Sequence, residues 1–185
     1  MPIAAGAMLL GALAVRRAGS ARRVPSGGSP AMQPDISSLN GTALPRLHVS
    51  ALTGGRTGRL PDSGLVIFVQ PRCVASRRLT AMIDGQLDVA KSEVPVILAV
   101  VAEQDEARRL AVAAPGQAQR VHVLPSRLPS ELRTSIPCAV MLAPGRRVRH
   151  AGSMSDDSAM TRFIEACGDK RVRQWFNSLP AQTGT

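Results

Sequence analysis

The chain has 185 residues, of which 44% are hydrophobic and 19% are charged. This composition allows one compact domain with a hydrophobic core and excludes a disordered acidic chain. Three cysteines are too few to hold a small fold together by disulfide bonds, and the scarcity of aromatic residues (2%) leaves the core to aliphatic side chains and Met.

The net charge is strongly positive and is concentrated towards the amino-terminal end. It amounts to +10, and residues 1–61 carry seven Arg against a single acidic residue, Asp35. Such a basic tail can follow the phosphates of a lipid or of a nucleic acid. We interpret it as a positive segment beside a membrane and keep a lipid-surface or nucleic-acid binder as an alternative. No nucleic-acid partner is expected, because no aromatic residues for base stacking alternate with the arginines.

Residues 1–18 form an apolar segment that we predict to be a membrane anchor. The stretch from Pro2 to Val15 is uncharged and is followed by arginines. It is shorter than the roughly 20 residues of a spanning helix, and its charge follows the apolar run, unlike that of a secretory signal. The positive-inside tendency alone would keep the domain in the cytoplasm. Residues 19–45 are rich in Gly, Ser and Pro and are predicted to be a linker and a loosely ordered entry segment.

Residues 46–170 show the pattern of one α/β domain, in which apolar runs alternate with amphipathic stretches. The predicted elements are a short edge hairpin near 47–55, a strand at 64–69, a helix at 75–87, a strand at 94–102, a helix at 107–114, a strand at 120–124, a hairpin at 139–151 and a helix at 155–167. This order, β-α-β-α-β-β-α after the edge hairpin, gives an open sheet with helices on both faces. Residues 171–185 are predicted to be a C-terminal helix and tail that pack on the domain, rather than a partner-binding or membrane-surface element.

Cys73 is the candidate reactive residue, because it directly follows the first buried strand and opens a helix. Unpaired backbone N–H groups and the helix dipole favour a thiolate there, and Arg72 and Arg77 would add positive potential if they point towards the sulfur. A thiolate can attack a disulfide and form a mixed disulfide. Ser76 can donate a hydrogen bond to that thiolate but cannot resolve the mixed disulfide. The alternative is a partly buried, inert cysteine.

Several short motifs in this order resemble a known family. They are Gly28–Ala31 (GSPA), Val66–Cys73 (VIFVQPRC), Ile136–Pro137 and Ala139–Arg146 (AVMLAPGR). Together, over roughly residues 28–168, they resemble the thioredoxin fold, and more specifically the membrane-anchored thiol–disulfide proteins of the TlpA and MauD (methylamine utilization) type. The sequence departs from the family at its redox motif. Cys-x-x-Cys is replaced by Cys73-Val74-Ala75-Ser76, and Arg72 stands where an aromatic residue often precedes it.

The resemblance implies thiol–disulfide exchange on protein thiols in the cell envelope, with an unknown redox donor, no cofactor and a domain facing the periplasm. Cys73 and Ser76 would be the catalytic pair, and Ile136, a cis Pro137 and Arg72 would shape the client groove. Cys138 would be a candidate resolving thiol, and otherwise a small buried strand residue. A non-catalytic thioredoxin-like binding or assembly module is the alternative function. The three histidines stand far apart in the sequence, so no metal site is expected.

Overall fold

A computed structural model describes residues 35–51, 57–84, 93–113 and 120–179 of the chain. The strands of this part are β1 (His48–Ala51), β2 (Thr57–Arg59), β3 (Gly64–Val69), β4 (Val96–Val101), β5 (Arg120–Val123), β6 (Cys138–Ala143) and β7 (Arg147–Ser153). The α-helices are α1 (Val74–Asp84), α2 (Gln104–Ala113), α3 (Ser130–Thr134), α4 (Asp157–Cys167) and α5 (Lys170–Asn177). Short 3-10 helices are η1 (Ile36–Leu39), η3 (Pro125–Arg127) and η4 (Pro144–Arg146).

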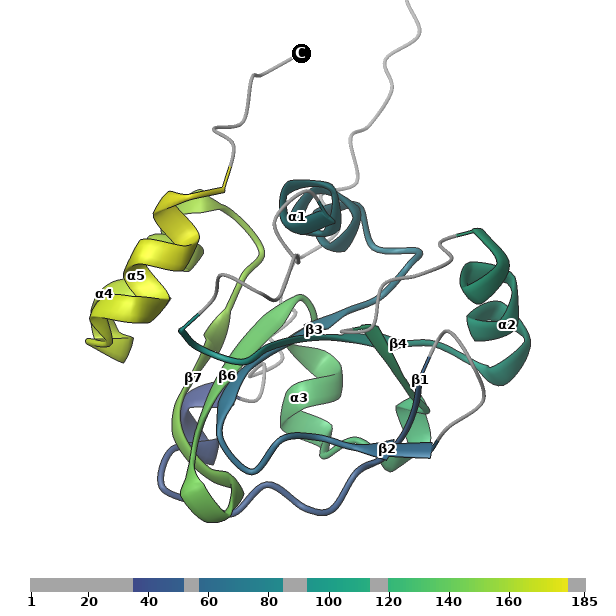
Figure 1. Ribbon diagram of the computed structural model, residues 1–185, viewed down its shortest axis with the longest axis horizontal. Coiled ribbons are helices and arrows are strands. Elements are labelled where there is room, and N and C mark those ends of the chain that lie inside the picture. Colours follow the sequence, from purple (N-terminus) through teal and green to yellow (C-terminus); the bar gives the residue numbers. More distant parts are fainter. Residues whose placement is uncertain (1–34, 52–56, 85–92, 114–119, 180–185) are drawn as a thin grey trace, which may run out of the picture. The chain divides into compact units, whose positions relative to one another are not determined.

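In the described residues, seven strands form one mixed sheet in the order β2-β1-β5-β4-β3-β6-β7 (Figure 1). The strands β3, β4 and β5 are parallel neighbours, whereas β6 runs antiparallel to both β3 and β7. Helices α1 and α2 lie in the connections between the parallel strands. The predicted α/β class is therefore confirmed. The predicted edge hairpin is also present, because β1 and β2 pair antiparallel at the edge of the sheet. The Gly54-Gly55 turn that was expected to join its strands lies outside the described residues.

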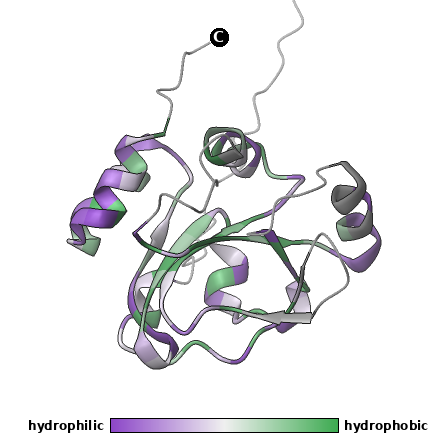
Figure 2. Ribbon diagram, in the orientation of Figure 1, coloured by the Kyte–Doolittle hydropathy of each residue, from purple (hydrophilic) through white to green (hydrophobic). Residues whose placement is uncertain are grey.

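The sheet is covered on both faces, and β3 in its interior therefore buries all six of its residues. Successive side chains of a strand point to opposite faces, so Leu65, Ile67 and Val69 join one core cluster while Val66 and Phe68 join another. The first cluster packs under α1, α4 and α5, and the second under α3 and η1 (Figure 1). Figure 2 shows the same division as hydrophobic strands between helices with hydrophilic outer faces. Burial on two faces explains why the sequence of β3 is apolar without alternation.

The final helices begin and end where their sequence predicts. The carboxylate of Asp156 accepts the N–H of Ala159 at 2.8 Å and caps α4, which ends at Gly168 in the left-handed conformation. Helix α5 buries Val172, Trp175 and Phe176 in the first core cluster and contacts α4. The carboxyl-terminal segment thus contains a helix that packs on the domain, as far as the structure describes it.

The entry segment is folded over residues 35–45, although the sequence predicts it to be loosely ordered. Ile36 and Leu44 are buried in the second core cluster, and Ala43 forms a β-bridge with Arg147. Asn40 Oδ1 accepts the backbone N–H of Ala151 at 2.8 Å. The folded domain therefore includes residues before the predicted boundary at residue 46.

The predicted anchor at residues 1–18 and the linker up to residue 34 lie outside the described residues. None of the helices that the structure describes is long and apolar enough to cross a membrane.

Candidate functional site

Cys73 lies at the junction between the central strand and the first helix. Strand β3 ends at Val69, and a turn closes when the N–H of Cys73 donates to the carbonyl of Gln70 at 3.0 Å. The carbonyl of Cys73 accepts the N–H of Arg77 at 3.0 Å, so Cys73 is the residue from which α1 starts. Its side chain is neither fully buried nor fully exposed. The thiol therefore stands at the amino-terminal end of a helix and within reach of solvent.

Ser76 is the polar partner of this thiol and is itself only 1% exposed. Its Oγ accepts the N–H of Gln70 at 3.0 Å, and its carbonyl accepts the hydroxyl of Thr80 at 2.8 Å. Because the lone pairs of Oγ serve Gln70, the hydroxyl hydrogen is available to donate to Cys73. Ser76 thus ties the turn after β3 to the first turn of α1, close in sequence to the thiol.

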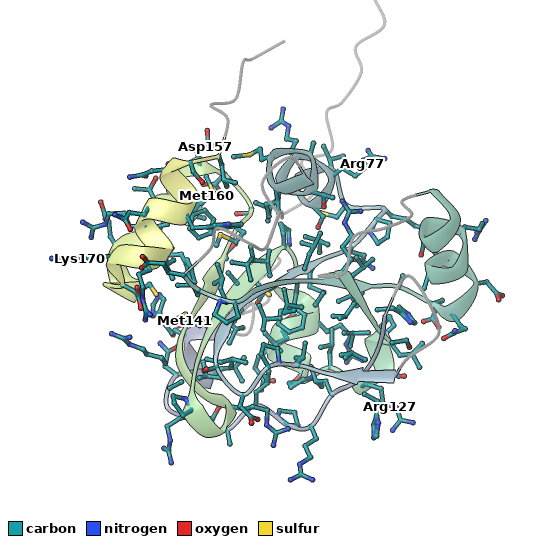
Figure 3. The ribbon with its side chains drawn as sticks, in the orientation of Figure 1. Arg77, Arg127, Met141, Asp157, Met160 and Lys170 are labelled. Carbon is teal, nitrogen blue, oxygen red and sulfur yellow. The ribbon has the colours of Figure 1, made fainter. Side chains whose placement is uncertain are left out.

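The pKa of Cys73 is lower than that of an ordinary cysteine, because the effects that lower it outweigh the one that raises it. Partial burial raises the pKa, because it disfavours the charged form, but the hydrogen bonds that the thiolate accepts from its neighbours outweigh this effect. These come from the N–H and hydroxyl of Ser76 and the N–H of Ala75, and the charge of Arg77 adds to them. Figure 3 shows Arg77 on α1. The first turn of α1 therefore stabilises a thiolate at Cys73.

Arg72 does not take the role expected from the sequence. Its guanidinium Nε donates to the carboxylate of Glu106 at 3.2 Å, and its side chain is 79% exposed. The ion pair directs Arg72 towards the first turn of α2, and the cations that lower the pKa of Cys73 do not include it. An exposed pair of this kind contributes about 0–1 kcal/mol to stability. Nothing in the sequence predicted Glu106 as the partner, because it lies 34 residues further along the chain.

The loop before β6 meets the same end of the sheet as Cys73. Phe68 near the end of β3 pairs with Cys138 at the start of β6, so Pro137 lies level with the carboxyl end of β3. The Ile136–Pro137 bond is cis, as the resemblance implies. The carbonyl of Pro137 accepts the N–H of Met154 at 2.8 Å, which joins this loop to the turn between β7 and α4. Pro137 is buried and Ile136 packs against the second core cluster.

Cys138 is a buried strand residue, and the structure gives it no access as a resolving thiol. It has no exposed surface, it lies in the second core cluster, and its thiol donates towards the carbonyl of Leu132 at 3.9 Å. Burial raises the pKa of the Cys138 thiol, so the neutral form dominates. All three cysteines are free, and Cys167 lies in the first core cluster as predicted. Of the three, Cys73 alone combines exposure with a lowered pKa.

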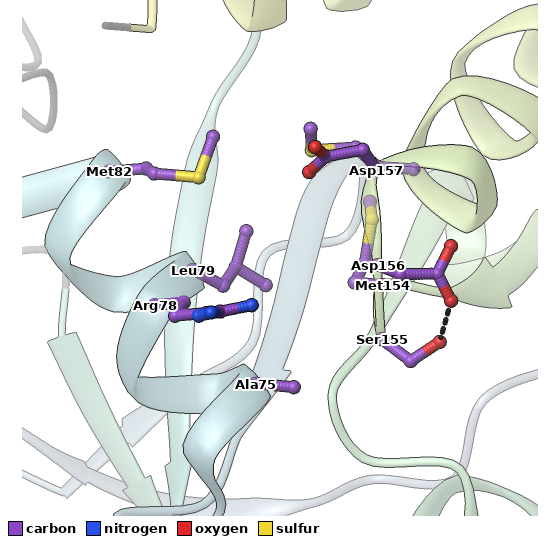
Figure 4. A pocket seen from close by; sticks show the side chains of 9 residues that line it. Ala75, Arg78, Leu79, Met82, Met154, Ser155, Asp156 and Asp157 are labelled. Atoms are coloured by element: carbon purple, nitrogen blue, oxygen red, sulfur yellow. Dashed lines mark hydrogen bonds between the residues drawn. The ribbon is translucent and has the colours of Figure 1, made fainter. Parts of the chain in front are cut away.

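A groove of about 120 Å³ runs along α1 on the side that faces the turn between β7 and α4. Figure 4 shows side chains of α1 on one wall and residues of the turn on the other. Its lining residues are Ala75, Arg78, Leu79, Met82, Met154, Ser155, Asp156, Asp157 and Met160. The sequence analysis did not predict this groove, and Ile136, Pro137 and Arg72, which were expected to shape a client groove, do not line it. Met154 follows β7, and its hydrogen bond to Pro137 connects the groove to the predicted loop.

No group of three His, Cys, Asp or Glu side chains in the described residues is arranged to hold a metal ion. His122 instead lies buried in β5, with its Nε2 2.8 Å from the carbonyl of Ala102.

Comparison with models of known protein families gives no match, and a search of curated proteins gives none either. The fold and the site together define an α/β protein with a partly exposed cysteine at the start of the helix that follows its central strand.

The reactivity of Cys73 is expected to depend on pH in the direction that its lowered pKa sets. Because the thiolate is the nucleophile, the rate of alkylation by iodoacetamide should rise with pH and reach its plateau at a lower pH than that of a peptide thiol. The pH midpoint of the rate profile should be compared, and not the plateau rate, because a thiolate of lower pKa is also intrinsically less nucleophilic. Mass spectrometry of the modified peptide would follow Cys73 separately. A midpoint at or above that of the peptide would contradict the hydrogen-bonded thiolate.

Proposed function

We propose that this protein is a thioredoxin-like thiol–disulfide exchange factor of the membrane-anchored TlpA and MauD type, which uses Cys73 on client proteins of the cell envelope. The observation that carries the proposal is the position of Cys73, which is partly exposed at the start of α1, where its neighbours lower its pKa. The arrangement of β3 between β4 and β6 supports it, because that arrangement brings the loop at Pro137 to the same end of the sheet.

The reaction begins with attack of the Cys73 thiolate on one sulfur of a client disulfide. A bond forms between Cys73 Sγ and that sulfur, the client S–S bond breaks, and the second client sulfur leaves as a thiolate. Ser76 and the N–H of Ala75 stabilise the thiolate before attack, and again when it is the leaving group in the reverse step. No net oxidation occurs in this step, because one disulfide is exchanged for another.

Release of the client requires a second thiol that the first turn of α1 does not contain. Ser76 stands at the position of the second cysteine in the family motif, and Cys138 is buried in the other core cluster. A thiol from outside the domain, either a small soluble thiol or another cysteine of the client, must attack the mixed disulfide and restore Cys73. We therefore propose exchange, isomerisation or retention of a client rather than dithiol reduction, with no cofactor.

A non-catalytic binding or assembly module is the second candidate, and the replacement of the second motif cysteine by Ser76 favours it. In that case Cys73 would be a structural residue at the helix start. The two candidates differ in whether the sulfur reacts, because only the first requires a mixed disulfide.

Trapping of a mixed disulfide tests the proposed function. We expect the folded protein, incubated with an oxidised peptide disulfide and then acid-quenched, to gain one peptide per chain at Cys73. Cys73→Ala should abolish this adduct, and Ser76→Ala should slow its formation near neutral pH because the thiolate loses a hydrogen-bond donor. Mass spectrometry would identify the modified residue.

Cys138→Ala is the matched control, since it removes a buried thiol that is not expected to react. Adduct formation in that variant should equal that of the unmodified protein. If the unmodified chain forms no adduct at Cys73 while remaining folded, the exchange proposal is abandoned in favour of the binding module.

A further inference from the structure

We infer that a basic surface at the start of β7 and of α5 binds the anionic headgroups of a phospholipid bilayer and holds the Cys73 end of the domain away from it; this rests on the proposed function, which supplies the membrane anchor. The basic surface consists of five exposed cations, which are Arg147, Arg149, Lys170, Arg171 and Arg173.

Two short segments supply these cations, and a buried valine holds each segment to the domain. Residues 146–149 (RRVR) and 170–173 (KRVR) share one pattern of two basic residues, a valine and a third basic residue. Val148 and Val172 have no exposed surface and belong to the second and the first core cluster, respectively. Because the valines point into the core, the charged side chains beside them remain at the surface.

Asp169 brings the two segments together. Its Oδ2 lies 3.8 Å from Nη1 of Arg149 and 3.4 Å from Nη2 of Arg171. The side chain of Asp169 is 8% exposed, whereas the side chains of the two arginines are 54% and 53% exposed. One nearly buried carboxylate thus fixes two guanidinium groups that still face solvent. Both arginines line a depression of about 280 Å³ that also includes Gly64 and Pro144, at the amino end of β3.

Positive charge prevails around the basic surface. Arg146 adjoins it, and so does the exposed Arg46, because Leu44 donates its N–H to the carbonyl of Arg146 at 2.9 Å. The acidic residues that adjoin it are Asp62, Glu93, Glu165 and Asp169. Seven cations therefore stand against four carboxylates, and basic residues in such excess are attracted to the negative surface of a membrane.

A lipid surface fits this charge better than a nucleic acid does. The chain contains three Phe, one Trp and no Tyr, and all four aromatic rings are buried, so no ring is exposed on which a base could stack. The predicted anchor at residues 1–18 would also keep the domain beside a bilayer, because residues 19–34 span at most about 60 Å even when fully extended.

Binding through the basic surface sets the direction in which Cys73 faces. Arg147 pairs with Ala143 where β6 meets β7, and the adjacent Leu142 pairs with Gly64, the first residue of β3. Cys73 lies beyond the other end of β3, which is six residues long, so this strand separates the two sites by roughly 17 Å. A domain held by its basic surface therefore presents Cys73 to clients in solution.

Quenching of Trp175 by the bilayer tests this arrangement. Trp175 lies on α5, two residues after Arg173, and is the single tryptophan of the chain. The full chain is mixed with vesicles that carry a nitroxide on some headgroups, made from phosphatidylcholine alone or from phosphatidylcholine and phosphatidylserine at about 7:3. We expect at least twice as much quenching in the phosphatidylserine vesicles. About 0.5 M NaCl should remove the difference, because salt screens charges at a surface.

Lys170→Gln with Arg173→Gln tests whether the basic surface is responsible. Each basic residue near an anionic membrane strengthens binding roughly fivefold, so the loss of two should lower the ratio of docked to free domain roughly 25-fold. Arg127→Gln with Arg133→Gln is the matched control, because it removes the same charge from exposed positions between β5 and β6. Figure 3 shows Arg127 on the side of the domain away from Lys170. Quenching in the control should equal that of the unmodified chain.

The inference is overturned if quenching is equal in the two kinds of vesicle, or if the control pair reduces it as much as the α5 pair does. Tighter binding of duplex DNA than of phosphatidylserine vesicles, at equal phosphate concentration, would also overturn it in favour of a nucleic-acid partner. Lipid-dependent quenching in a chain whose Cys73 forms no adduct would support the basic surface and reject the exchange function. An adduct at Cys73 without lipid-dependent quenching would do the reverse.

Discussion

Replacement of Gly64 by alanine is expected to destabilise the domain by about 3 kcal/mol, a large part of the stability of a domain of this size. Gly64 begins β3 with a φ of +132°, and a Cβ at this position would lie 2.5 Å from the backbone carbonyl oxygen of Pro95. The same oxygen accepts the N–H of Leu65 at 2.8 Å, so it cannot move away without loss of that hydrogen bond. Backbone strain of this kind costs about 1–3 kcal/mol, and the steric overlap adds to it.

Urea unfolding followed by the fluorescence of Trp175, the single tryptophan of the chain, would measure this loss. Gly41→Ala is the matched control, because Gly41 has a φ of +79° and nothing within 4 Å of an added Cβ. It should lose only the roughly 1–2 kcal/mol of the left-handed backbone. Equal losses in the two variants would show that the junction between β3 and Pro95 adjusts to a side chain.

Features encoded by neighbouring residues could be predicted from the sequence. The burial of β3 follows from its continuous apolar run, and the ends of α4 follow from the cap at Asp156 and the stop at Gly168. The place of Cys73 and Ser76 on the first turn of α1 also depends on local spacing, because residues three apart are neighbours at the start of a helix.

Features that depend on contacts far along the chain could not be predicted in the same way. Leu44 lies in a segment without a helical or strand-like apolar pattern, and its N–H donates to the carbonyl of Arg146, about a hundred residues further on. Helix α3 has five residues, which is too short to show a period. The face on which Cys138 lies depends on the register of β6, and a shift by one residue would reverse it. Cys138 shares the cluster of Phe68 and Val140 under α3, whereas Ala139 faces α1.

Ser76→Cys is expected to convert the site from one that holds a client into one that releases it. Ser76 follows Cys73 by three residues on the first turn of α1, which is the spacing of the two cysteines in the family motif, so a sulfur introduced there is placed to attack a mixed disulfide at Cys73. That attack forms a disulfide within the variant and frees the client sulfur as a thiol. Two electrons pass to the client, and dithiothreitol must reduce the variant before the next cycle. We expect reduction of insulin disulfides by dithiothreitol to be accelerated at least tenfold over the unmodified chain.

Ser76→Cys also weakens the hydrogen bond between the Gln70 N–H and residue 76. This loss of stability must be measured separately from the faster insulin reduction. Sulfur accepts the N–H of Gln70 less well than Oγ of Ser76 does, so the free energy of unfolding should fall by about 1 kcal/mol. Ser76→Ala removes the same acceptor without adding a thiol, and its insulin reduction should not exceed that of the unmodified chain. Acceleration that persists in Ser76→Cys with Cys138→Ala would place the second thiol in the first turn of α1. If the folded Ser76→Cys variant reduces insulin no faster than Ser76→Ala, Cys73 is not the attacking sulfur, because a competent thiolate with a resolving partner beside it must turn over.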